Sequence, residues 1–161
     1  MDRFSLKPEV GLRTFLTEIV LFALFYGFIL INFIDSSFNN NNLTYGPYYH
    51  FWLIAMYFAP FVLIGILLPD HWEIFVALGL LASIMNDGLW GFWHILVGDF
   101  SSGQFWSWLY HWYVPTSDVL FDLSLGVKVP VYGWIMALSI YGRAVVVGLL
   151  LRKWWREPWE S

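Results

Sequence analysis

Three histidines and one aspartate are the side chains in this sequence best suited to chemistry. His50, His94 and His111 all fall toward one end of the apolar segments that contain or adjoin them. Asp87 lies two helical turns before His94 and is expected on the same helical face. Neutral imidazoles together with carboxylates are the ligands of zinc, iron and copper sites in proteins. The sequence therefore predicts a metal site held by His50, His94 and His111, with Asp87 beside it as a proton-relay group. The alternative for each histidine is an interfacial side chain that hydrogen-bonds a carbonyl group or water.

The spacing of these residues limits the chemistry. Asp87 and His94 would lie about 10 Å apart along one helix, too far for both to bind a single ion directly, and they match no compact metal motif. Haem is a less favoured cofactor, because only His50 and His94 approach the matched depth that axial ligation needs. The chain has no cysteine, which excludes thiolate metal sites and disulfides. Ser83, Asp87 and His94 have the residue types of a hydrolytic triad, but they would lie on one helix at increasing depth.

Charged residues inside apolar segments are the second signal. An aspartate near the centre of a membrane helix costs roughly 2.5–3.5 kcal/mol, so Asp87 should be paired, hydrated or used. Arg143 lies inside the last apolar run and Glu18 inside the first. We expect a structural ion pair between Arg143 and either Glu18 or Asp87. The alternative is that the arginine extends to the nearer membrane interface.

Small residues predict which way Asp87 faces. Gly79, Ser83, Asp87 and Gly91 recur every four residues, so they share one face of a helix. Such a face allows a neighbouring helix to approach closely. We therefore expect Asp87 to face the interior of the protein rather than lipid.

The composition identifies the elements that must position these side chains. Of the 161 residues, 59% are hydrophobic and 12% charged, and the mean hydropathy is +0.61, as in a polytopic membrane protein. Four apolar runs, each close to the roughly 20 residues that span a bilayer core, cover residues 12–34, 49–68, 73–97 and 131–151. The sequence predicts one all-α integral membrane domain over residues 1–161, a bundle of four transmembrane helices.

The segment between the last two runs, residues 98–130, is rich in aromatic residues. Trp and Tyr side chains favour the headgroup zone, so a short interfacial helix is expected around residues 105–113. After Pro115, a second short helix ending near Gly126 is expected. This segment forms either a lid over the bundle or an aromatic belt that only anchors it.

The basic residues predict the orientation. Six of the eight lie in the two tails, namely Arg3, Lys7, Arg13, Arg152, Lys153 and Arg156. The positive-inside rule then places both termini in the cytoplasm and residues 98–130 outside.

These features predict a small membrane-embedded protein with a polar pocket open to the outer leaflet, which handles a lipid-like or apolar ligand with or without a metal. Whether it is an enzyme stays open. The alternative is a non-catalytic accessory subunit of a larger membrane complex. Membrane lipids are the expected partners, with assembly into a homo-oligomer or a larger complex. No basic patch indicates nucleic acid.

Overall fold

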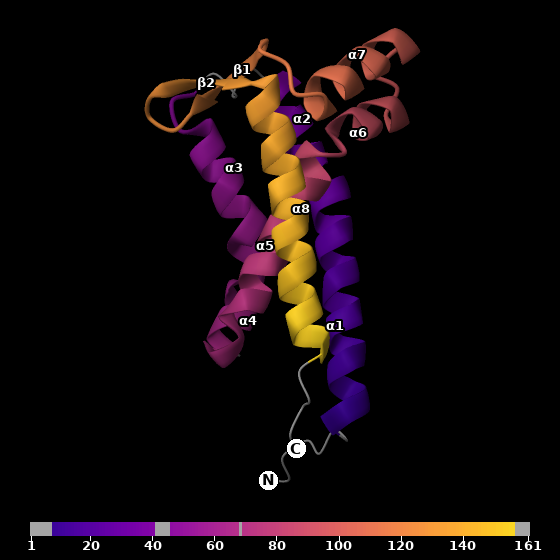
Figure 1. Cartoon of the computed structure of the whole chain (residues 1–161), viewed down its shortest axis with the longest axis vertical. Helices are drawn as coiled ribbons and strands as arrows, with labels where there is room; N and C mark the ends of the chain where they lie inside the picture. The colour runs from indigo at the N-terminus through magenta and orange to yellow at the C-terminus, as the bar shows by residue number, and fades with distance from the viewer. Residues whose placement is uncertain (1–7, 41–45, 68, 157–161) are drawn as a thin grey trace.

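The computed structural model describes residues 8–40, 46–67 and 69–156 and shows a mostly helical protein, with 78% helix (Figure 1). The tail cations Arg3 and Lys7 lie outside these residues. The described elements are α1 (Pro8–Phe25), a π-helical turn (Tyr26–Ile31), α2 (Asn32–Asn40), α3 (Tyr49–Phe58), a 3-10 turn (Ala59–Phe61), α4 (Val62–Leu67), a second 3-10 turn (Pro69–His71), α5 (Trp72–Asp87), α6 (Trp90–Leu96), α7 (Ser102–Tyr113), β1 (Val119–Ser124), β2 (Lys128–Tyr132) and α8 (Gly133–Arg156).

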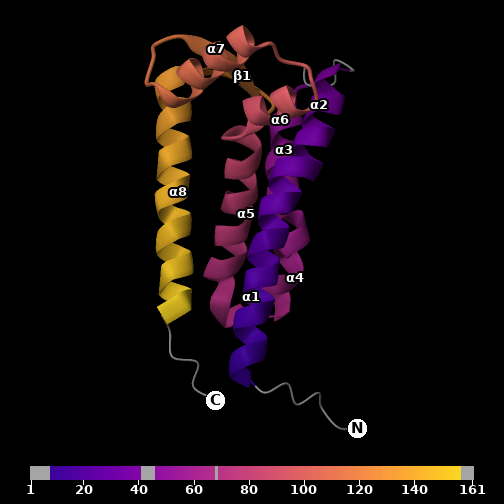
Figure 2. The same cartoon turned by 90° about the vertical axis from the view of Figure 1, so that its right-hand side faces the viewer.

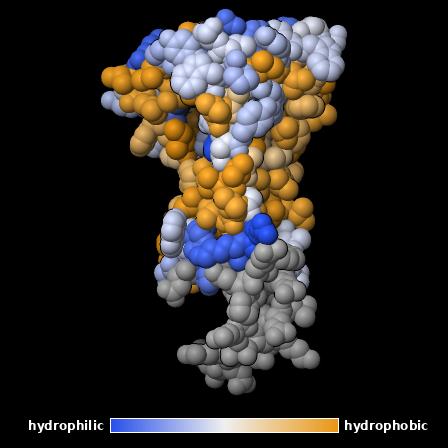
Figure 3. All heavy atoms as spheres, viewed as in Figure 1, coloured by the Kyte–Doolittle hydropathy of each residue, from blue (hydrophilic) through white to orange (hydrophobic). Residues whose placement is uncertain are grey.

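Three described helical segments are long and apolar enough to cross a membrane: Thr17–Asn39, Tyr49–Leu67 and Gly133–Lys153. The bent pair of α5 and α6 makes a fourth if it is counted as one span. Figure 3 shows a broad hydrophobic zone on the middle of one face, with hydrophilic residues gathered toward its two ends. The number and order of these segments agree with the four apolar runs of the sequence.

The first helical segment continues beyond residue 34, where the apolar run was predicted to end. It passes through Asn32 and Asp35 and ends at Asn40. Both polar side chains have hydrogen-bond partners on other helices, Asn86 for both and Tyr49 for Asp35. Because their polar groups are satisfied inside the protein, they do not end the helix.

The third apolar run is not one straight helix. α5 and α6 meet at Gly88 and Leu89 at an angle of 53°. The end of α5 leaves carbonyl groups without partners in the helix, and the hydroxyl group of Tyr113 donates to the carbonyl oxygen of Gly88. Burial raises the pKa of Tyr113, so the hydroxyl stays protonated and able to donate at neutral pH.

The segment after Pro115 differs from the prediction. α7 agrees with the short helix expected around residues 105–113 and begins at a capping box formed by Ser101 and Gln104. The second short helix was wrong, because β1 and β2 pair there as an antiparallel hairpin. Gly126 in the connecting turn has a φ of +91°, a conformation that helices do not use. The β-branched valines of β2 also favour an extended backbone.

The described buried residues form two separate hydrophobic clusters. The larger one joins α1, the π-helical turn, α3, α4 and α5, and includes Phe61 and Leu78. The smaller one joins the hairpin to α8 through Val131, Met136 and Ile140. α6, α7 and the hairpin lie at one end of the molecule, and the start of α1 and the end of α8 lie at the other (Figures 1 and 2). Asp87 of α5 and Arg143 of α8 form an ion pair between an element of the larger cluster and an element of the smaller one.

Gly27 lies at a close approach between the first helical segment and α5. A Cβ atom added at Gly27 would lie 2.4 Å from the carbonyl oxygen and 2.8 Å from the Cα of Ala82. These are backbone atoms, which cannot rotate away as the end of a side chain could. The two helices can therefore pack at this distance only with glycine at position 27.

Gly27→Ala should destabilise the protein by about 1–3 kcal/mol, because the two backbones must move apart. The matched control is Gly148→Ala on α8, where a Cβ meets no atom within 4 Å. Alanine is the better helix former, so the control should be neutral or stabilising. Thermal unfolding in detergent measures both. Equal unfolding temperatures for Gly27→Ala and the unchanged protein would contradict the close packing.

Candidate functional site

The bend between α5 and α6 determines where Asp87 and His94 point. Asp87 is the last residue of α5 and faces α8, whereas His94 lies in α6 and contacts Ser36 of α2. The prediction that the two residues share one helical face was wrong. The bend lies between Asp87 and His94, so counting 3.6 residues per turn from one residue does not give the direction of the other.

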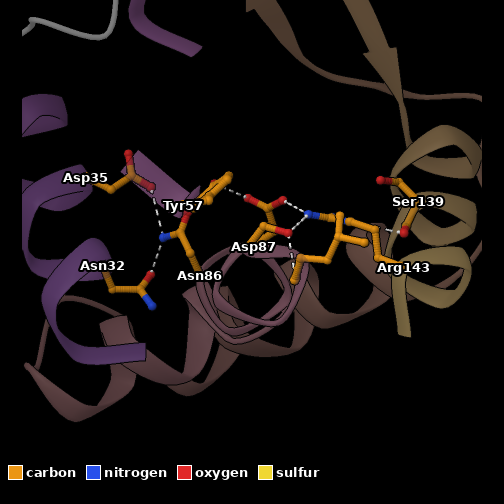
Figure 4. A network of polar contacts seen from close by, with 9 residues as sticks. Asn32, Asp35, Tyr57, Asn86, Asp87, Ser139 and Arg143 are labelled. Atoms are coloured by element: carbon orange, nitrogen blue, oxygen red, sulfur yellow. Dashed lines mark hydrogen bonds and ion pairs between the residues drawn. The ribbon is translucent and has the colours of Figure 1, made fainter. Parts of the chain in front are cut away.

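Asp87 forms an ion pair with Arg143 of α8 (Figure 4). The Nη1 atom of Arg143 lies 2.6 Å from Oδ2 of Asp87 and 2.9 Å from Oγ of Ser83. The Nε atom of Arg143 donates to the carbonyl oxygen of Ser139 at 3.1 Å, one turn earlier on α8. Glu18, the other expected partner, is exposed on α1. The arginine is therefore held against α5 rather than extended toward an interface.

A chain of hydrogen bonds continues from Asp87 to the first helical segment. The hydroxyl group of Tyr57 lies 2.7 Å from Oδ1 of Asn86 and 3.1 Å from Oδ1 of Asp87. The amide group of Asn86 donates to Oδ1 of Asn32 at 2.9 Å and to Oδ2 of Asp35 at 3.4 Å. Figure 4 shows this network running across the protein from α2 to α8. It links four helices through side chains in otherwise apolar surroundings.

The far end of the network is Asp35, whose other carboxylate oxygen accepts a hydrogen bond from Tyr49. Asn32, Asp35 and Asn86 were not among the predicted site residues. The sequence did contain a signal, since Asn32 and Asp35 are polar residues one turn apart at the end of the first apolar run, and Asn86 precedes Asp87. Their partners could not be read from the sequence, because these depend on how α2 packs against α5.

A pocket of about 800 Å³ opens beside this network. Its walls are apolar residues of α3 and α8, and its roof is made by the hairpin and Trp112. Ser83, Asp87, Ser139 and Arg143 form a polar patch at its base, which we call the polar base. Asp35 and Tyr49 line the pocket on the α2 and α3 side. One cavity therefore combines apolar walls with a charged, hydrogen-bonded base.

The three histidines of the predicted metal site do not come together. His50 Nδ1 accepts a hydrogen bond from the backbone amide of Ser124 at 2.8 Å. His111 Nδ1 lies 2.7 Å from the carbonyl oxygen of Ser107 in its own helix. Within the described residues, no group of three or more His, Cys, Asp or Glu could hold a metal ion. The histidines share one end of the molecule, as expected from their depth, but face different neighbours, so metal binding is not supported.

His94 belongs to a separate buried cluster. Its Nδ1 lies 3.2 Å from Oδ2 of Asp99 and its Nε2 lies 3.4 Å from Oγ of Ser36. This is the order of atoms in a hydrolytic triad, but Ser36 and His94 are both buried and neither lines the pocket. The Ser36 hydroxyl also accepts a hydrogen bond from Nε1 of Trp93. The cluster fixes α6 against α2 and thereby holds the bend.

Arg143→Met should destabilise the protein because it leaves the carboxylate of Asp87 without its cation. Removing one partner of a fully buried ion pair lowers the free energy of unfolding by about 3–5 kcal/mol. The side chains of Arg143 and Asp87 are 17% and 25% exposed, so we expect a loss of about 3 kcal/mol or less. Adding Asp87→Asn should recover much of the loss. Thermal unfolding of the two single variants and the double variant measures the interaction energy between Arg143 and Asp87.

Arg152→Met is the matched control for this cycle, since Arg152 is exposed on the same helix. It should leave the unfolding temperature unchanged. Additive effects of Arg143→Met and Asp87→Asn would show that the ion pair contributes nothing to stability.

No protein-family model, curated protein or solved structure matches this chain. The polar network and the pocket beside it are therefore the basis for a functional proposal.

Proposed function

We propose that this protein is an integral membrane protein with four spans, whose pocket binds an amphipathic, lipid-like ligand taken from the outer leaflet. The observation that supports this best is the pocket itself, which places apolar walls and a charged base in one cavity of about 800 Å³. Small-molecule sites typically measure about 300–1,000 Å³, with mostly apolar walls and a few polar groups that orient the ligand. An amphipathic molecule fits both kinds of surface.

The roof of the pocket supports a ligand that offers hydrogen-bond acceptors. Trp112 lines the pocket, and its indole N–H is buried without a partner among the described residues. A buried unsatisfied donor costs about 1–3 kcal/mol. A ligand with a hydroxyl or ester oxygen near Trp112 would recover part of that cost.

The proposed orientation places both termini in the cytoplasm and the pocket near the outer surface. The start of α1 and the end of α8 lie at the end of the molecule opposite the hairpin and α7 (Figure 2). Six of the eight basic residues belong to the two tails, which supports the cytoplasmic assignment. The hairpin and α7, rich in aromatic side chains, would then lie at the outer headgroup zone.

Filling the pocket should remove the bound ligand. Ser139 lines the pocket and is exposed on α8, so Ser139→Trp adds a large side chain to the cavity without removing a core residue. Native mass spectrometry of protein extracted from membranes should show an amphipathic molecule bound to the unchanged protein, with occupancy lower by about tenfold in the variant, equivalent to about 1.4 kcal/mol.

Leu138→Trp is the matched control for this experiment, because Leu138 is exposed on the same turn of α8 and does not line the pocket. It should keep the ligand. An unchanged protein that carries no amphipathic molecule but purifies with other membrane subunits would favour the accessory-subunit alternative instead.

The orientation can be tested with single cysteines, because the chain has none of its own. Gly103→Cys in α7 is exposed and meets no neighbouring atom, and Arg152→Cys is exposed near the end of α8. A membrane-impermeant maleimide should label Gly103→Cys in intact cells and Arg152→Cys only after permeabilisation. The reverse pattern would overturn the orientation.

A further inference from the structure

We infer that the ligand of the pocket carries a protonated amine, and that Asp35 is its counter-ion. This inference rests on the proposed function, since it identifies the chemical class of the amphipathic ligand. The shared chemistry is an alkylammonium group on an apolar chain. An ethanolamine phospholipid and a free long-chain amine both present it.

The charges that line the pocket do not balance. Three carboxylates face two cations, and the residues are Asp35, Asp87, Asp122, Lys128 and Arg143. Asp87 is matched by Arg143 at the polar base, while Asp122 and Lys128 are exposed side chains of the hairpin. The remaining carboxylate belongs to Asp35.

Asp35 has neutral partners only, within the part of the chain that the structure describes. Its oxygens accept hydrogen bonds from the hydroxyl group of Tyr49 and the amide group of Asn86. No described ion pair includes it. A carboxylate can accept about four hydrogen bonds, so Asp35 keeps acceptor capacity for a ligand. A charge that is partly desolvated without a counter-ion is unfavourable, and an ammonium group would compensate it.

Aromatic rings continue from Asp35 along the pocket. Tyr49 lies against His50 with ring centroids 4.8 Å apart, and His50 stacks on Phe121 at 5.4 Å. Phe121 stacks on Trp112 at 5.9 Å, and Trp112 on Trp90 at 6.2 Å. All five residues line the pocket. Because the rings of His50, Phe121, Trp112 and Trp90 stack on one another, the row gives the alkyl part of the ligand an apolar wall that begins beside Asp35.

Arg143 is already paired within the protein. Its Nη1 and Nε atoms are engaged by Asp87, Ser83 and Ser139. The neighbouring carboxylate of Asp87 opposes any negative ligand at the polar base. Lys128, the first residue of β2, is exposed, so water screens its charge.

The test compares three photoreactive long-chain probes that differ only in the end group: an amine, a hydroxyl or a carboxylate. The protein is reconstituted in nanodiscs of phosphatidylcholine, and labelled peptides are mapped by mass spectrometry. The amine probe should label pocket residues at concentrations at least about tenfold lower than the hydroxyl probe, because a charge-assisted hydrogen bond is the stronger one. The carboxylate probe should label least.

Asp35→Asn should remove the preference for the amine while hydroxyl-probe labelling persists. Asp118→Asn is the control, since Asp118 is an exposed carboxylate that does not line this pocket. If Asp35→Asn does not fold, the comparison of the three probes on the unchanged protein still tests whether the pocket prefers an amine. Competition by nanodiscs containing phosphatidylethanolamine identifies the lipid as a source, and competition by a free alkylamine alone identifies the soluble amphiphile.

Equal labelling of the pocket by all three probes, or a preference for the carboxylate, would overturn the amine inference and leave the amphiphile pocket standing. Labelling by none of the probes within the pocket would overturn both.

Discussion

The ion pair between Asp87 and Arg143 is the interaction on which the rest of this structure depends. Neither charge is tolerated alone in apolar surroundings, because desolvation of a single ion costs several kcal/mol. The pair joins the end of α5 to the middle of α8, with a separation of 2.6 Å. It therefore sets how deep α8 lies relative to α5.

The pair also explains why a pocket can exist beside α8. The described buried residues of the larger cluster belong to α1, the π-helical turn, α3, the 3-10 turn, α4 and α5, whereas the smaller cluster joins α8 to the hairpin. α5 and α8 also lie side by side, and the Asp87 and Arg143 pair lies where they meet. Polar side chains fixed by hydrogen bonds keep their positions without filling all the space, so a cavity remains next to them.

The sequence predicted the main helical segments and the inward position of Asp87, because apolar length and the cost of a membrane charge are local properties. It also indicated that Arg143 needs a partner. It could not choose between Glu18 and Asp87, since that choice depends on which helices pack together. The hydrogen bonds of Asn32 and Asp35 with Asn86 escaped prediction for the same reason.

Each error has a physical cause. A bend of 53° at Gly88 separates Asp87 from His94, so residues counted onto one helical face point to different neighbours. His50, His94 and His111 belong to α3, α6 and α7, and the direction of each ring depends on the bend and on the hairpin. The hairpin itself was mistaken for a helix because its cap-like residues outweighed the valines and the glycine turn.

The hairpin couples the roof of the pocket to both clusters. Phe121 of β1 stacks on His50 of α3 and on Trp112 of α7, while Val131 of β2 packs with α8. A ligand held under this roof would touch α3, α8 and the hairpin at the same time. Occupancy of the pocket would therefore stabilise the docking of α8, since a ligand that binds only the assembled state adds its binding free energy to that state.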